Sequence, residues 1–482
     1  MTDLFGFSSL CVLSLRFFPP KTKESSVVEE DKDFVRDSIV PFLCKPVIRV
    51  AIIFIFAGAL VASVLGLNTI KQGLNLKQVT EKGTQVYDFI DTRYAYFAFY
   101  PASIVAKNVD FSDPSTQRAY LDGMEKILEG QYSSYRVDTW LLQFLNWCDP
   151  TVCDVTVDQN PLVTKCGSSF HCTTNSEGLF DGTTEDFMKC LNHWNKQTTV
   201  TSSPNFYPLS NNGMGNDDIL DPIEYCEYPF YTQDLWETED YVNMIDNIRS
   251  TIDEIKKDTG MELYPSGYQF EYWEQYRNLY SNLRFSLCVA IACTFAIGTL
   301  SIFIATTGTR ACSISSSQLI GQIFQSMHGS LIMTISIIST MIMLLGFMGF
   351  AEIQMSAIPA VTVIACIGIC VDLTALVTLF FCQATGTQDE RVADALSCVL
   401  IPTLDSMTST IVGCLAMGFS VIELYVLYFF AMYVAVAVIG TLNGLVLLPV
   451  LLAWFGPRES KLSATAAVSP KAATKHVELT KV

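Results

Sequence analysis

Two aspartates inside long apolar runs are the residues with the clearest potential for chemistry. Asp372 is the single charged side chain of residues 358–381, and Asp405 opens the next run, in IPTLDSMTSTIVG. An acid at membrane depth costs about 2.5–3.5 kcal/mol and usually marks a proton or cation pathway. The alternative is a neutral aspartate that hydrogen-bonds to a neighbouring helix. We expect ion coupling at Asp372, while for Asp405 a helix-start or interfacial role is equally open.

Small and polar residues accompany these acids. Gly368 and Cys370 stand just before Asp372, where their small side chains permit neighbouring helices to approach closely. Asn443 and Gly444 occupy the last apolar run, and Asn443 offers a polar contact between helices. We expect these four residues to pack near the ion site.

These acids have this meaning only if their segments cross a membrane. Six apolar runs in the sequence predict such membrane-spanning segments. Each run reaches or approaches the ~20 residues that cross a ~30 Å bilayer core. They are Pro46–Leu67, 283–305, 331–350, 358–381, 399–419 and 425–454. Half of the residues are apolar and only 16% are charged, below the ~25% of soluble domains. The chain is therefore predicted to be a polytopic α-helical membrane protein with one span, a large insertion and five more spans.

The insertion, residues 69–282, is predicted to be a hydrated α+β domain. Residues 69–280 hold 32 acidic and 15 basic residues, nearly all of the net charge of −18. Bulk charge therefore argues against binding of nucleic acid or anionic lipid. Helical periodicity at residues 116–128 and 242–257 alternates with short strand-like segments, a pattern typical of α+β domains.

The insertion also carries an even number of cysteines. Six cysteines in an oxidising compartment can form three disulfides among 15 pairings. They are Cys148, Cys153, Cys166, Cys172, Cys190 and Cys226. A zinc site with His171 and His193 is the alternative, although the spacings lack the paired short knuckles of structural zinc sites. We expect disulfides and no bound metal.

Charge near the spans predicts the topology. Basic residues precede the first run and follow the last, and such residues tend to stay cytosolic. Both termini are then cytosolic, and the insertion is extracellular or lumenal. The expected organisation is a cytosolic linker at 1–45, a first helix at 46–68, a disulfide-bonded domain at 69–282, a five-helix bundle at 283–455, and a disordered cytosolic tail at 456–482. The expected location is the plasma membrane or an endomembrane.

Several segments resemble Patched proteins. Residues 264–276 (YPSGYQFEYWEQY) are similar to the segment that leads into the family's eighth span, and residues 292–295 (ACTF) stand in the span that follows. Residues 440–457 (GTLNGLVLLPVLLAWFGP) resemble its final span, Leu404-Asp405 with Ser409-Thr410 its eleventh, and residues 41–73 its seventh. The resemblance is to the C-terminal half of a Patched-like member of the resistance-nodulation-division superfamily, which is related to the Niemann-Pick type C transporter and to Dispatched.

The resemblance implies movement of sterols, other lipids or lipid-modified ligands, coupled to H⁺ or Na⁺ flux. Asp372 falls on the family's tenth-span acid. The chain departs from the family pattern at Cys370, where the family has a second glycine, and at Leu376, where it often has histidine. About twenty extra residues, 306–330, separate the second and third spans. The family's N-terminal half is missing, so we expect self-association or pairing with such a half.

The leading hypothesis is a half-size, ion-coupled sterol or lipid transporter without a cofactor. The alternative is a non-transporting, lipid-sensing receptor or scaffold, in which Asp372 only packs. An enzyme is not expected, because no span carries a paired aspartate, a serine–histidine pair or an HExxH sequence.

Overall fold

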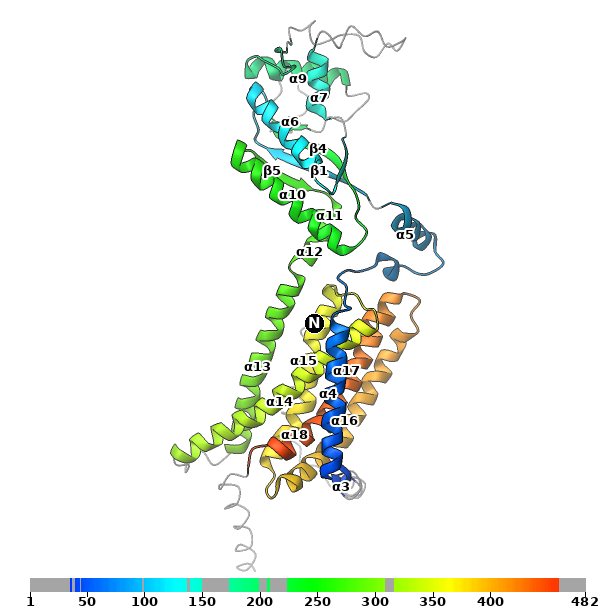
Figure 1. Cartoon of the computed structure of the whole chain (residues 1–482), viewed down its shortest axis with the longest axis vertical. Coiled ribbons are helices and arrows are strands. Elements are labelled where there is room, and N and C mark those ends of the chain that lie inside the picture. The colour runs from blue at the N-terminus through cyan, green and yellow to red at the C-terminus, as the bar shows by residue number, and fades with distance from the viewer. Residues whose placement is uncertain are drawn as a thin grey trace, which may run out of the picture. The chain divides into compact units, whose positions relative to one another are not determined.

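The structure is a computed structural model. It describes residues 35–36, 40–43, 45–97, 99–136, 139–149, 172, 174–198, 206–208, 223–307 and 316–458. The chain divides into two compact units (Figure 1): a membrane unit within residues 1–87 and 279–482, and an inserted domain at residues 88–278. Residues 69–87, which the sequence placed in the insertion, pack with the membrane unit. The N-terminal linker to residue 34 and the tail from residue 459 lie outside the described residues.

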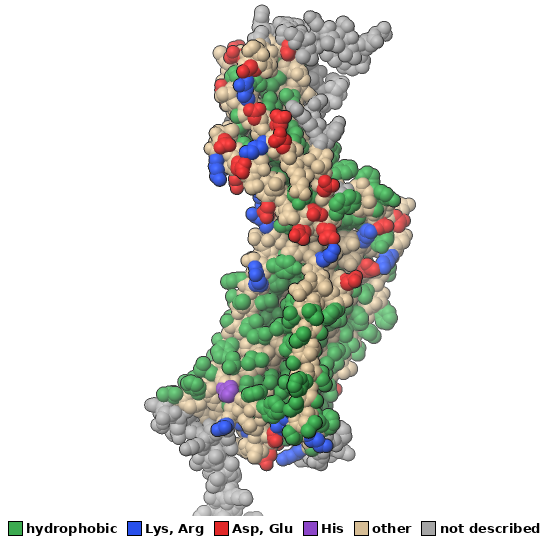
Figure 2. Space-filling model, in the orientation of Figure 1, with side chains coloured by type: hydrophobic (Ala, Val, Ile, Leu, Met, Phe, Trp, Pro, Cys, Tyr) green, Lys and Arg blue, Asp and Glu red, His purple; other side chains and the backbone are tan. Residues whose placement is uncertain are grey.

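Among the described residues, six helical stretches are long and apolar enough to cross a membrane, which confirms the predicted class of fold. The membrane unit begins with α3 (Val40–Leu43) and α4 (Pro46–Leu67), followed by the short η2 (Leu76–Val79). After the inserted domain come α13 (Leu279–Thr307), α14 (Ser316–Phe350), α15 (Ala357–Gln383) and α16 (Gln388–Gly418). Apolar side chains cover the outside of these helices (Figure 2), as contact with lipid requires.

The last span changes its helical winding three times. It runs as η5 (Tyr425–Ala431), α17 (Met432–Leu442), η6 (Asn443–Leu447) and α18 (Leu448–Phe455), of which η5 and η6 are π-helical. Pro449 is the second residue of α18, one residue beyond the end of η6. A proline lacks its N–H and clashes with the carbonyl four residues earlier, so a wider π-helical turn before it relieves the clash.

α14 is longer than a span requires. Its 35 residues extend about 52 Å at 1.5 Å per residue, beyond the ~30 Å apolar core of a bilayer. The first turns, from Ser316 to Ser330, belong to the extra segment that the sequence comparison placed between two spans. The structure makes these turns a continuation of the third span.

Glycines bring α4 and α14 into close contact. A β-carbon on Gly66 would lie 2.6 Å from the carbonyl oxygen of Gly346, and Gly346 and Gly349 in turn abut Ser63 and Gly66. Side chains larger than hydrogen do not fit here without separating the backbones. The first span is thus fixed to α14 by a seam of small residues.

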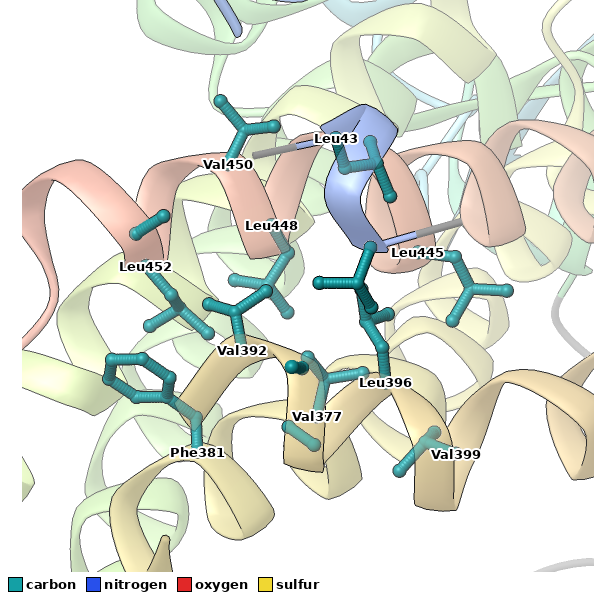
Figure 3. Packing of buried hydrophobic residues seen from close by; sticks show 14 of the residues in the cluster. Leu43, Val377, Phe381, Val392, Leu396, Val399, Leu445, Leu448, Val450 and Leu452 are labelled. Atoms are coloured by element: carbon teal, nitrogen blue, oxygen red, sulfur yellow. The ribbon is translucent and has the colours of Figure 1, made fainter. Parts of the chain in front are cut away.

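A buried apolar cluster joins the ends of α15, α16 and the last span. Figure 3 shows Phe381 of α15 and Val392 and Leu396 of α16 facing Leu448 of α18. Leu43 of α3 enters the same cluster, so the last residues of the predicted linker form a packed helix against α16.

Two arginines secure this end of the unit. Arg391 is fully buried, donates from Nε to the Phe381 carbonyl (3.0 Å) and from Nη1 to the Pro457 carbonyl (2.7 Å), and lies over the Phe381 ring. Arg49 of α4 pairs through Nη2 with Oδ1 of Asp389 (2.6 Å). Both contacts hold the first turns of α16, which begins with a capping box at Thr387.

A strap, residues 68–84, follows α4 and is held on the membrane unit. The Gly73 N–H donates to the Met355 carbonyl (3.0 Å), and the Met355 N–H donates to the Lys71 carbonyl (2.8 Å). Further on, the Tyr428 hydroxyl donates to Gln78 Oε1 (3.1 Å), and Lys82 forms an ion pair with Glu423. The pair raises the pKa of Lys82, chiefly through its hydrogen bond to Glu423.

The inserted domain is built on an antiparallel sheet. β1 (Tyr100–Lys107) pairs on one side with β4 (Ile223–Thr232) and on the other with β5 (Glu262–Ser266). β2 (Ser133–Arg136) and β3 (Phe206–Pro208) both pair with β4. Alternate residues of β1 are buried, the last of them Ile104 and Ala106, as expected for a sheet with one covered face.

Helices complete the domain: α5 (Gln85–Tyr96), α6 (Pro114–Leu128), α7 (Trp140–Cys148), α9 (Thr184–Thr198), α10 (Thr238–Thr259), α11 (Tyr268–Tyr272) and α12 (Glu274–Arg277). α6 and α10 match the predicted helices. The isoleucines of α10, Ile245, Ile248, Ile252 and Ile255, are buried, and Ile255 contacts α6 at Gly123. α10 ends at Gly260, whose φ of 74° suits a glycine.

The cysteines differ in state. Cys172 and Cys190 form a disulfide that ties the approach to α9 to the helix itself. Cys148 and Cys226 are buried free thiols, contrary to the expectation of half-cystines at these two positions. Burial raises the pKa of each of these two thiols to about 12. Cys153, Cys166 and His171, which the other pairings and the zinc alternative need, lie outside the described residues.

Candidate intramembrane ion site

Asp372 lies on an open stripe of α15. From the start of this helix to Asp372, the exposed residues follow each other at spacings of three and four, which places them on one face: Ala357, Val361, Ala365, Gly368 and Asp372. Four of the five are small or carry the acid. Within the described residues, the Asp372 carboxylate has no hydrogen bond or ion pair. The acid is therefore presented outward from the six-helix unit.

Asp405 occupies a comparable position on α16, which packs against α15. Because α16 begins at Gln388, Asp405 stands near the middle of a 31-residue helix and not at its start. Asp405 is exposed, as is Ser409 one turn later, and a β-carbon on Gly413 would meet nothing within 4 Å. Asp405 is therefore an exposed acid in the middle part of α16.

The four predicted packing residues divide between two faces. Gly368 shares the open stripe, and a β-carbon there would also meet nothing within 4 Å. Cys370 is buried on the other side of α15, near Gly440 of α17. Gly444 lies against Leu373 and Thr374. Cys370 and Gly444 therefore pack the last span against α15, and they do not surround the acid.

Asn443 anchors a polar network inside the unit. It is fully buried at the first residue of η6, and its Oδ1 accepts a hydrogen bond from the Ser339 hydroxyl (3.0 Å). Its Nδ2 donates to the Ile439 carbonyl (2.9 Å) and to the sulfur of Met343 (3.4 Å). The side chain is thus satisfied by α14 and by its own helix, which is a packing role.

The exposure of Asp372 and Asp405 determines what the site can do chemically. A carboxylate that faces lipid is costly, so in a membrane this face requires either protein or water against it. Small residues beside Asp372 would let another helix approach closely. The sequence predicted Asp372 as a site residue but did not predict the exposed stripe of α15. The small residues that recur at helical spacing before Asp372 could have indicated it.

Fold and site together define a class: a polytopic membrane protein with one span, an inserted α+β domain, five further spans, and acids on the helices of the bundle.

No family model matches the chain. Individual proteins do match. Protein patched homolog 1 of Caenorhabditis elegans is 29% identical over 472 residues, which cover 88% of this chain and 32% of that protein. Protein patched homolog 1 of Danio rerio is 27% identical, with 88% and 37% covered.

More distant relatives agree. NPC intracellular cholesterol transporter 1 of Sus scrofa is 21% identical, with 90% of this chain and 35% of that protein covered. Among solved structures, the hedgehog release protein Disp from the water bear Hypsibius dujardini superposes with a TM-score of 0.56 at 14% identity, covering 88% of this chain and 50% of that one. The chain is thus similar to Patched proteins over 88% of its length, and its fold is similar to that of Disp. It spans about a third of the length of the curated relatives it matches.

Proposed function

We propose that this chain is a six-span unit of a sterol or lipid transporter, in which Asp372 couples transport to the flux of H⁺ or Na⁺. The observation that carries the proposal is the placement of Asp372 on an open stripe of small residues. A charge that must load and release a cation needs access to water and a neighbour that moves. A buried, fully hydrogen-bonded aspartate offers neither.

The names of the relatives support the cargo class. One is a cholesterol transporter, and another is a hedgehog release protein. We therefore assign sterol or other lipid as the cargo, with the inserted domain on the extracytosolic side. A lipid-sensing receptor or scaffold is the second candidate, and it is favoured if Asp372 tolerates neutralisation.

We further propose that a second six-span unit covers the open stripe, because a single unit leaves Asp372 and Asp405 facing lipid. A second copy of this chain is one such unit, and an N-terminal half is the other. To distinguish these two possibilities, two copies of the chain with different affinity tags are expressed together without any N-terminal half. If each tag also purifies the other copy, the second unit is another copy of this chain.

Sterol efflux from cells that express the tagged chain tests the function. We compare wild type, Asp372→Asn and a matched control, Gly58→Ala, whose β-carbon would meet nothing within 4 Å on the outside of α4. Loss of efflux in Asp372→Asn alone, at equal surface amount, supports ion-coupled transport. Equal efflux in all three forms contradicts a coupling role for Asp372, and no efflux above that of untransfected cells in any form favours the receptor or scaffold. Dissipating the proton gradient and the sodium gradient separately then names the ion.

A further inference from the structure

The first turns of α14 expose apolar side chains and bury polar ones. Ile320 is 61% exposed, Phe324 73% and Met327 40%, and at 100° per residue these three side chains project within about one sixth of the helix circumference. Gln322 and Ser326 are buried on the opposite side. A helix at the surface of a soluble protein has the reverse pattern. We name Ile320, Phe324 and Met327 the α14 face.

The α14 face continues the side of the same helix that faces lipid within the span. Leu331 and Ile335 follow Met327 at intervals of four residues, are about half exposed, and project from the same side. Residues 316–350 contain no aspartate, glutamate, lysine or arginine. His328 is their one titratable side chain, and the neutral imidazole is amphipathic enough to lie at a leaflet boundary. No fixed charge therefore interrupts this apolar side.

Only part of α14 is needed to cross the bilayer beside its neighbours. A β-carbon on Gly329 would lie 3.2 Å from the sulfur of Cys382, in the last turn of α15. From Gly329 to Phe350, the last residue of α14, the helix rises about 32 Å, which matches the ~30 Å apolar core. Residues 316–328 extend for about 20 Å beyond this point.

This extension runs sideways from the bundle. Figure 1 shows α14 running obliquely to α4, so that its first turns project laterally past the end of α13. Figure 2 shows apolar side chains continuing from the spans over this projecting part. An oblique helix stays within the thickness of a bilayer over a greater length than an upright helix does. The extension therefore remains beside the leaflet in which α15 ends.

We propose that the α14 face inserts into the acyl layer of this leaflet, so that residues 316–328 form a lateral membrane anchor. The occupant is the acyl chains of phospholipids, because the face is the direct continuation of a lipid-facing span and its side chains are large and apolar. Since residues 316–350 carry no lysine or arginine, the contact does not depend on anionic headgroups.

The anchor gives the extra segment between the second and third spans a place in the membrane. The sequence alone indicated only that residues 306–330 separate two spans. With residues 316–328 in the leaflet, the membrane unit is wider in that leaflet than in the other one. The inference stands apart from the proposed function, because it requires neither transport nor Asp372.

Photocrosslinking from the α14 face tests the proposal. p-Benzoyl-phenylalanine replaces Phe324 in the full chain, which is reconstituted in nanodiscs of phosphatidylcholine. The same group at Ile335 marks a lipid-facing position of the span, and at Thr385 it marks an exposed position in the turn between α15 and α16. Mass spectrometry separates lipid adducts from peptide adducts and locates each lipid adduct on an acyl chain or on the headgroup. Size-exclusion profiles confirm folding, and Ile320 carries the probe if the variant at position 324 does not fold.

We expect acyl-chain adducts at position 324 to exceed those at position 385 at least tenfold and to lie within threefold of those at position 335. The yield should stay within twofold when a third of the lipid is anionic, and it should be the same in an Asp372→Asn background. Acyl-chain adducts as rare at position 324 as at position 385 would overturn the proposal. Adducts on headgroups alone would also overturn it, and so would predominant peptide adducts, because these would show that a protein surface covers the α14 face.

Discussion

Gly66 of α4 and Gly346 of α14 are in backbone contact, since a β-carbon on Gly66 would lie 2.6 Å from the Gly346 carbonyl oxygen. Between these two helices the chain passes through the strap, the inserted domain and α13. The seam therefore joins the span before the inserted domain to a span after it. The loss of stability on substitution in the seam measures how tightly the first span is held.

Gly346→Leu should destabilise the membrane unit, because the added side chain has no room beside Ser63. Overpacking of this kind typically costs about 1–3 kcal/mol. Thermal melting of the purified chain in detergent measures the effect. The control is Gly58→Leu on α4, where an added β-carbon would meet nothing within 4 Å. Equal melting temperatures for the two variants would show that the seam does not constrain the fold.

Asn443 and Ser339 should be energetically coupled. Asn443→Leu leaves the Ser339 hydroxyl without its acceptor, and Ser339→Ala removes the donor. Hydrogen bonds between membrane helices average about 0.6 kcal/mol of coupling and reach about 1.7 kcal/mol. A double-mutant cycle of unfolding free energies provides the value. Strictly additive single effects would mean that the 3.0 Å bond contributes nothing.

The free thiols of the inserted domain should resist alkylation in the folded chain. With a pKa of about 12, only about one in ten thousand Cys148 or Cys226 side chains is a thiolate at pH 8. Ionisation rises with pH, so reactivity should increase only toward strongly alkaline conditions. Iodoacetamide labelling and peptide mapping should find Cys172 and Cys190 in a disulfide-linked pair of peptides. Cys148 or Cys226 in a disulfide would contradict the structure.

Bulk at Gly368 should block association without disturbing the six-helix unit. Gly368→Leu places a side chain where a β-carbon has no neighbour within 4 Å, so melting should change little. A helix of a second unit could then no longer approach Asp372 closely. Co-purification of two tagged copies should fall at least several-fold, while Gly58→Leu leaves it intact. Undiminished co-purification would place the association on another face.

The ion pair of Lys82 with Glu423 should restrain the strap. Lys82→Ala should speed cleavage of residues 76–84 by protease, and high salt should have a similar effect on the wild type, because both side chains are partly exposed. The folded pKa of Lys82 is raised above 10.5, so at alkaline pH the restraint should persist up to that value and be lost as the pH rises through the folded pKa. If Lys82→Ala does not change the cleavage rate, the contacts of Gln78 and Met355 hold the strap without the ion pair.

The membrane spans were predictable because long apolar runs leave few alternatives to a helix in lipid. α6 and α10 were predictable because their apolar residues recur with helical spacing over more than three turns. α9 was missed, although Phe187, Leu191 and Trp194 carry the same spacing and are buried. The cysteines and turn-forming residues around α9 favoured a prediction of loops and short strands in this region.

The direction in which Asp372 faces was not predictable, because small residues occur on several sides of α15 and the sequence does not say which side the neighbours occupy. The same limit applies to Cys148 and Cys226. An even count of cysteines allows pairing, but the fold decides which pairs come close enough, and Cys226 instead contacts the Tyr120 hydroxyl.

The strands by which the chain enters and leaves the inserted domain, β1 and β5, are direct neighbours, with Ser103 opposite Ser266. Adjacent strands lie about 5 Å apart, so the domain closes on itself whatever its flanks are doing. It is in effect a detachable module: a short flexible linker across its two ends should allow it to be produced without a membrane, and the same junction would accept a different domain in its place.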